Sequence, residues 1–130
     1  MVDGDLWGKS RLLMEEARRD LDAGCPNKAV SASYFAVRMA AESLLRGLRT
    51  RKDDKVANAL ERLLEPTLGE ERAGEIRNSF LRLFSLRKAA DHTPRVFSLE
   101  EAREIVGEAE AVLVTLEAVR RGPRRIGPGE

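Results

Sequence analysis

The chain has 130 residues, of which 42% are hydrophobic, which is enough for one compact domain with a single core and too little for two ordinary domains. Its 23 basic and 22 acidic residues leave a formal net charge of +1, which excludes a strong overall attraction to nucleic acid, so any such contact must come from a local patch. One cysteine and one histidine exclude an intrachain disulfide and a multi-cysteine zinc site, and we expect no metal and no other cofactor.

The first half of the chain predicts two helices, because Ala, Leu, Glu and Arg recur throughout and all favour helix. The first is predicted to begin after Asp3 or Asp5 and to stop at Gly24, with an apolar stripe made of Leu6, Trp7, Leu13, Met14, Ala17 and Leu21. Pro26 fits the first position of a second helix, which the pattern extends to about Arg49. Its many small residues would let neighbouring helices approach closely, so we predict that it is the central helix of a bundle.

Three further helices are predicted after the polar connection RTRKDD. A short one, closed by Pro66, has an apolar face of Val56, Leu60, Leu63 and Leu64. The next must end near Asp91, because the residue before Pro94 is pushed away from helical geometry; its apolar residues are Ile76, Phe80, Leu83, Phe84 and Leu86. Ser98 and Glu101 form a capping-box pattern that opens the last helix, whose buried face is predicted to be Ala102, Ile105, Val106, Ala109, Val112, Leu113, Leu116 and Val119.

Short connections between long amphipathic helices favour antiparallel neighbours. The expected fold is therefore all-α, an up-and-down antiparallel bundle of four main helices plus a short helix, within a single domain of residues 1–121. Residues 122–130 are expected to form a disordered basic tail, because this stretch is rich in glycine and proline. No segment approaches the roughly 18 apolar residues that a membrane span needs, so we expect a cytoplasmic protein with no membrane contact.

The stretch SLRKAADHTP, residues 85–94, holds the histidine of the chain five positions after an arginine. One interpretation is a helix end with two solvated cations beside its C-terminal dipole. The other is a reactive pair, in which His92 supplies proton transfer as a general acid or base and the Arg87 guanidinium steadies developing negative charge. On a continuous helix the two positions are about 140° apart, so they converge only if the helix ends or tightens near Asp91.

Two separated segments resemble the HEPN domain family. GCPNKAVSASYFAVRMAAESLLRGL, residues 24–48, is similar to the start of the family's second helix, and LRKAADHT followed by SLEEAREIVGEAEAVLVTLEAV is similar to its other half. The resemblance implies a small helical bundle, usually a homodimer, whose ribonuclease members carry Arg, four to six residues, then His. Arg87 and His92 match that motif. Many small prokaryotic members have Tyr where this chain has His92, so the chain departs from that form toward the catalytic one.

The resemblance implies two functions. The first is a metal-independent endoribonuclease, the toxin of a toxin–antitoxin or defence pair with a small nucleotidyltransferase, in which a two-fold axis brings two His92 side chains to one cleft. The alternative is a noncatalytic dimeric HEPN module that binds a nucleotide or a nucleotidyltransferase partner.

Four other residues are candidates for supporting roles. Asp91 would either orient the His92 imidazole or cap the helix end, and the sequence does not choose between them. Glu42 would either reach the cleft as a polar group or be an ordinary surface residue. Lys88 and Arg95, which are close to His92 in sequence, are candidates for contacts to the RNA backbone.

Overall fold

The computed structural model describes residues 5–122, and within them it contains five helices and no strand, which confirms the expected all-α class. The helices are α1 (Leu6–Asp22), α2 (Pro26–Leu44), α3 (Asp53–Leu68), α4 (Glu70–His92) and α5 (Leu99–Arg121). None of these helices is long and apolar enough to cross a membrane.

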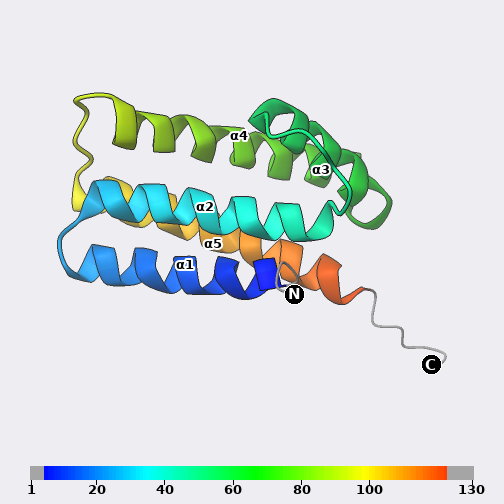
Figure 1. The fold of residues 1–130 in the computed structure, drawn as a ribbon, viewed down its shortest axis with the longest axis horizontal. Coiled ribbons are helices and arrows are strands. Elements are labelled where there is room, and N and C mark those ends of the chain that lie inside the picture. The colour runs from blue at the N-terminus through cyan, green and yellow to red at the C-terminus, as the bar shows by residue number, and fades with distance from the viewer. Residues whose placement is uncertain (1–4, 123–130) are drawn as a thin grey trace.

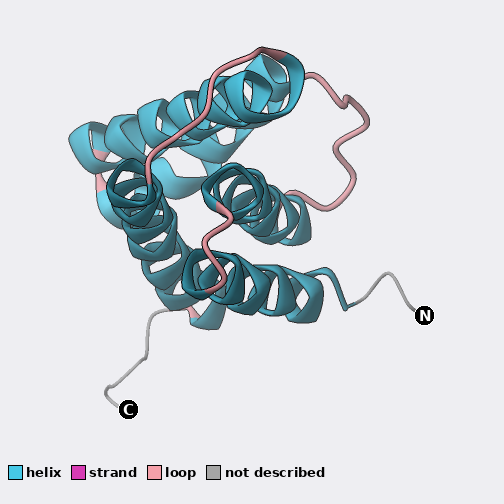
Figure 2. Cartoon of the chain, turned by 90° about the vertical axis from the view of Figure 1, so that its left-hand side faces the viewer, coloured by secondary structure: helices cyan, strands magenta, loops and turns pink. Residues whose placement is uncertain are grey.

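The bundle has α2 at its centre. Figure 1 shows α1, α2, α4 and α5 lying roughly along the long axis, each antiparallel to the one before it, while α3 packs against α4. The central helix contacts α1, α4 and α5, as its small residues predict, and Ala29, Ala36 and Ala40 are completely buried at these contacts. The turn between α1 and α2 and the loop between α4 and α5 lie at the same end, which faces the viewer in Figure 2.

Two helices differ in length from their predicted bounds. The second ends at Leu44 and not near Arg49, because the chain turns at Gly47, whose φ of 87° is a conformation that glycine adopts readily. The third continues through Pro66 to Leu68 and is 16 residues long. A proline in the last turn disturbs only that turn, so the helix ends at Gly69 instead, which has a φ of 89°.

The other helix ends follow the sequence signals. The first helix begins directly after Asp5, and the fourth ends at His92, one residue beyond the expected position. The capping box is confirmed: the Glu101 backbone N–H donates to Ser98 Oγ at 3.0 Å, and the Ser98 N–H donates to Glu101 Oε1 at 2.9 Å. Asp3, the other start considered for the first helix, and residues 123–130 of the expected tail lie outside the described residues.

An aromatic cluster joins α2 to α4. The Tyr34 ring is 2% exposed and makes edge or tilted contacts with Phe35, Phe80 and Phe84, with ring centroids 4.9, 6.1 and 5.8 Å away. Because this cluster fixes how α4 packs on α2, it also positions the side chains that follow on the last two turns of α4.

Candidate functional site

The arginine of the Arg–His stretch is held from two helices. Arg87 Nε donates to Asp91 Oδ2 at 3.0 Å, one turn further along α4, and the same oxygen accepts a hydrogen bond from Ser31 Oγ of α2 at 3.1 Å. The guanidinium carbon lies 4.9 Å from the centroid of the Phe35 ring and 5.9 Å from that of Tyr34. Within residues 5–122, its two terminal nitrogens have no protein partner. These nitrogens are therefore free to bind an anion.

His92 is the last residue of α4 and is exposed. In the part of the chain that is described, its imidazole makes no hydrogen bond or ion pair. The helix ends at His92, one residue past Asp91, but it is continuous through both Arg87 and His92, so the two positions remain about 140° apart around its axis. One chain alone therefore does not bring the pair together.

Asp91 plays neither of the two roles considered from the sequence, orienting the His92 imidazole or capping the end of the helix. Its carboxylate bridges Arg87 and Ser31 and does not orient His92, while the hydroxyl of Thr93 donates to the Ala89 carbonyl at 2.7 Å at the end of the helix. The Arg87–Asp91 pair is partly exposed, so the carboxylate orients the guanidinium more than it stabilises the fold.

Asn27, at the start of α2, fixes the loop after His92. Its side-chain nitrogen donates to the carbonyls of Ala90 at 3.1 Å and Arg95 at 2.9 Å, and its oxygen accepts from the Phe97 N–H at 2.9 Å. Sequence reasoning missed this role, because Asn27 stands in the GCPN turn, where asparagine is expected for local reasons. The contact ties the α4–α5 loop to α2 and so limits where His92 can lie.

An open groove of about 610 Å³ lies beside these residues, between the α1–α2 corner and the end of α4. Asn27, Ser31 and Asp91 line it together with charged residues of both signs, including Arg19 and Glu16. The groove gives a ligand access to the Asp91 carboxylate that holds Arg87.

The two candidates for RNA contacts lie over aromatic rings. Lys88 Nζ is 4.9 Å from the centroid of Phe84, and Lys88 lies one turn before His92 on the same face of α4. The Arg95 guanidinium carbon is 4.0 Å from the centroid of Phe97, and its Nη2 donates to Glu101 at 3.4 Å. Both side chains are exposed, and the two residues flank His92, Lys88 on α4 and Arg95 in the loop between α4 and α5.

A second polar cluster, which sequence reasoning did not find, surrounds Arg38 of α2. This arginine is only 9% exposed; its Nη1 lies 3.1 Å from Asp53 Oδ1 and its Nε donates to Glu42 Oε2 at 2.6 Å. The Tyr34 hydroxyl donates to Asp53 Oδ2 and accepts from Arg38 Nη1 at 3.3 Å, while Arg38 Nη2 donates to the Arg51 carbonyl at 3.3 Å. Burial, reinforced by the hydrogen bond to Asp53, raises the pKa of Tyr34 well above its usual range.

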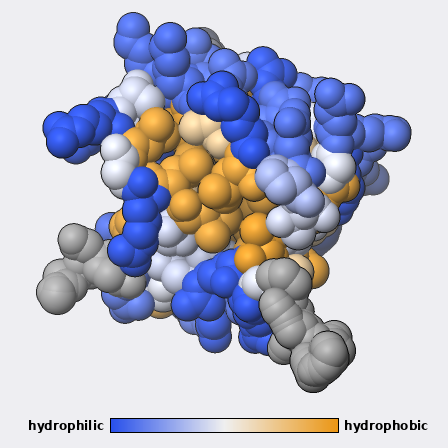
Figure 3. Space-filling model, turned by 90° about the vertical axis from the view of Figure 1, so that its right-hand side faces the viewer, coloured by the Kyte–Doolittle hydropathy of each residue, from blue (hydrophilic) through white to orange (hydrophobic). Residues whose placement is uncertain are grey.

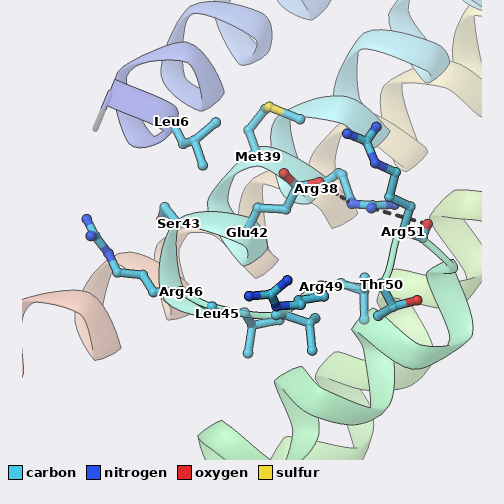
Figure 4. Close-up of a pocket in the computed structure, with 13 residues that line it drawn as sticks. Leu6, Arg38, Met39, Glu42, Ser43, Leu45, Arg46, Arg49, Thr50 and Arg51 are labelled. Carbon is cyan, nitrogen blue, oxygen red and sulfur yellow. Dashed lines mark hydrogen bonds and ion pairs between the residues drawn. The ribbon is translucent and has the colours of Figure 1, made fainter. Parts of the chain in front are cut away.

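Glu42 lies at the other end of α2 from the Arg87 site. It is eleven residues beyond Ser31, or about 16 Å along the helix axis, and it pairs with Arg38. Within one chain it therefore does not reach the cleft beside Arg87. It lines a different cavity of about 660 Å³ that the α2–α3 loop encloses (Figure 4). We call this cavity the arginine-rimmed pocket; it is lined by Leu6, Arg38, Met39, Glu42, Ser43, Leu45, Arg46, Gly47, Leu48, Arg49, Thr50, Arg51 and Val56.

Among residues 5–122, no cluster of three or more His, Cys, Asp or Glu side chains is close enough to hold a metal ion.

The fold and the Arg87 site together define a class: small antiparallel helical bundles that present an anchored arginine and a histidine at the end of one helix. The HEPN domain model matches residues 4–119, so the chain belongs to the HEPN domain family, as its sequence resemblance predicts. This family includes ribonucleases and nucleotide-binding modules, and its domains commonly dimerise and act on RNA. A comparison with curated proteins gives no match.

Proposed function

We propose that this chain is a metal-independent endoribonuclease in which Arg87 and His92 of two protomers form one active site. The observation that carries the proposal is that the Arg87 guanidinium is anchored on one side and unpaired on the other. Its Nε is held by Asp91, its face lies over Phe35, and both terminal nitrogens are without a protein partner in residues 5–122. A guanidinium fixed in this way presents a planar pair of donors that matches two phosphate oxygens.

The reaction divides among these groups as follows. The His92 imidazole of one protomer takes the proton of a ribose 2′-hydroxyl, and the 2′-oxygen attacks the adjacent phosphorus. The bond between phosphorus and the 5′-oxygen breaks, leaving a 2′,3′-cyclic phosphate, and the other His92 gives a proton to the departing 5′-oxygen. Arg87 stabilises the charge that collects on the non-bridging oxygens as the phosphorane forms.

A homodimer is part of the proposal, because one chain has one histidine and α4 keeps it away from Arg87. A two-fold axis near the end of α4 would place two His92 and two Arg87 side chains around one cleft. Lys88 and Arg95 would then flank this cleft and contact the RNA backbone. In a cell, such an enzyme would act as the toxin of a toxin–antitoxin or defence pair, with a small nucleotidyltransferase as its partner.

The direct test is cleavage of a fluorescent single-stranded RNA in the presence of EDTA. Arg87→Ala and His92→Ala are each expected to lower the rate by a factor of about 100 or more, the usual range for loss of a transition-state cation or an acid–base group. Arg103→Ala is the matched control, because Arg103 is an exposed arginine of α5. Undiminished cleavage by both site variants would refute the assignment, and a strictly monomeric active protein would refute the shared site.

A noncatalytic dimeric module is the second candidate, and the open groove of about 610 Å³ beside Asp91 favours it, since its size suits a nucleotide. This candidate predicts that calorimetry detects binding of a nucleotide or of a nucleotidyltransferase, that the binding survives His92→Ala, and that the wild-type protein cleaves no RNA. Binding that His92→Ala abolishes would contradict it.

A further inference from the structure

The arginine-rimmed pocket combines an apolar floor with a basic rim. Figure 3 looks onto this end of the bundle and shows a central apolar area surrounded by hydrophilic side chains. The apolar lining comes from Leu6, Met39, Leu45, Leu48 and Val56, and the basic lining comes from Arg38, Arg46, Arg49 and Arg51. Its volume of about 660 Å³ lies within the range of ordinary ligand sites.

The charges of this pocket are not balanced by the protein. Arg38 pairs with two carboxylates, Glu42 at 2.6 Å and Asp53 at 3.1 Å. Arg46, Arg49 and Arg51 have no hydrogen bond or ion pair from their side chains within residues 5–122. Three unpaired guanidiniums within six residues repel one another. Arginines after a helix often serve to bind its last carbonyls, at the negative end of the helix dipole, but none of these three side chains donates to the last carbonyls of α2.

The pocket lies on the same face of α2 as the Arg87 site. Ser31, Phe35, Met39 and Glu42 are spaced by four, four and three residues, so they form one stripe along the helix. Ser31 and Phe35 contact the Asp91–Arg87 pair, and Met39 and Glu42 line the pocket. From Phe35 to Glu42 the stripe is about 10 Å long, a distance that a few nucleotides of an extended strand can span.

We propose that the arginine-rimmed pocket binds the backbone of single-stranded RNA, on a strand that runs along α2 from Arg87. The inference rests on the proposed function, because the ligand is that enzyme's substrate. Guanidinium forks bind phosphate oxygens in pairs, and their planes also stack on unpaired bases, while the apolar floor receives the face of a base. In Figure 4, Arg49 extends across the pocket below Glu42, where a phosphate group would meet it.

The experiment measures RNA binding separately from cleavage. Fluorescence anisotropy measures the binding of a labelled single-stranded RNA of about ten nucleotides, a length within the usual site sizes for single strands. The protein is the full chain carrying His92→Ala, so that the RNA is not cleaved during the measurement. A triple variant, Arg46→Ala, Arg49→Ala and Arg51→Ala, is compared with a control triple that removes three exposed arginines elsewhere: Arg11→Ala, Arg62→Ala and Arg103→Ala. Both triples change the net charge equally, and all six side chains are exposed, so folding should be unaffected.

The pocket triple is expected to weaken binding at least about tenfold more than the control triple at physiological salt. It should also lower the slope of log affinity against log salt by about 2, since each lost phosphate contact on a single strand contributes about 0.7. Equal losses in the two triples, or no RNA binding by the parent protein, would overturn the inference. A competition measurement gives a further way to overturn the inference. If polyglutamate of equal charge displaces the labelled RNA as well as unlabelled RNA does, the pocket binds acidic protein segments equally well and is not an RNA site.

These outcomes separate the two proposals. If the protein with His92 intact cleaves RNA and the two triples bind equally, the endoribonuclease stands and the pocket assignment fails. If the pocket triple loses binding selectively but the protein with His92 intact cleaves nothing, the pocket binds RNA and the endoribonuclease fails.

Discussion

Replacing Asp53 with asparagine should destabilise the fold strongly, although Asp53 lies in the first turn of α3, where many substitutions are tolerated. Its carboxylate accepts from the Tyr34 hydroxyl and pairs with Arg38 at 3.1 Å, and the side chains of Asp53 and Arg38 are both only 11% exposed. An asparagine keeps the size of the side chain and can accept from the phenol. Its remaining amide group then faces the guanidinium, so Arg38 loses its most buried counter-charge.

The magnitude follows from these contacts. Removing one partner of a buried ion pair costs about 3–5 kcal/mol, and Glu42 still pairs with Arg38, so the lower end of that range applies. We expect a loss of about 3 kcal/mol in the free energy of unfolding. For a domain of this size, about 1 kcal/mol shifts the melting temperature by roughly 3–5 °C, so the midpoint should fall by about 10 °C.

Circular dichroism during thermal and urea unfolding measures the effect. The matched control is Asp54→Asn, which changes the next residue of the same helical turn and removes the same charge near the helix dipole, but whose side chain is exposed. It should cost about 0.5 kcal/mol. Equal losses for the two variants would refute the role of Asp53, because the effect would then belong to the helix end and not to the buried cluster.

Three further predictions concern single residues. Burial and the hydrogen bond to Asp53 raise the pKa of Tyr34, the tyrosine of this chain, so tyrosinate absorbance should be absent at about pH 11 while the protein is folded. The phenol of the unfolded chain ionises at lower pH than that of the folded protein, so the free energy of unfolding should fall as the pH rises above about 10. Asn27→Ala removes three hydrogen bonds and should cost about 2–3 kcal/mol, while amide exchange speeds up at Phe97. Ser98→Ala removes the helix cap and should cost about 1 kcal/mol in urea unfolding.

Two of these predictions have a control within α4. Asn78 is exposed on the helix surface, and Asn78→Ala should leave stability unchanged, so a comparable loss there would contradict the special role of Asn27. Ser85 is likewise exposed in mid-helix, and Ser85→Ala is the comparison for the loss of the Ser98 cap. A tyrosinate signal that rises near pH 10 while the helical signal is still intact would contradict the predicted protonation of Tyr34.

The sequence predicted what depends on local pattern. The Ser98–Glu101 cap and most of each apolar face follow from spacing, and Pro94 limits where α4 can end. Leu63 is the exception: it was predicted on the apolar face of the third helix and is 40% exposed. It misplaced the end of α2 because Leu45 and Leu48 continue the apolar period, and the pattern does not reveal that Gly47 turns the chain between them.

The Arg87–Asp91 and Arg38–Glu42 pairs are four residues apart on one helix, a spacing that a sequence can indicate. The other contacts that build the sites join residues far apart in the sequence, and no local signal pairs them. Arg38 was not singled out from the sequence, and its partner Asp53 lies in the stretch RTRKDD, which was interpreted as a polar connection. Arg87 and Asp91 were both singled out, but the residues around them did not indicate that the Asp91 carboxylate also binds Ser31 of α2 and not His92.

The Asn27 clamp also bears on the order in which the bundle assembles. Its three hydrogen bonds reach across 63, 68 and 70 residues, so each closes a long loop and forms only after the intervening helices have brought the ends together. Asn27 is synthesised early, but the donor to its side-chain oxygen is the backbone N–H of Phe97, which is synthesised 70 residues later, just before α5. We therefore expect the segment after His92 to be among the last parts of the protein to take a fixed position during folding.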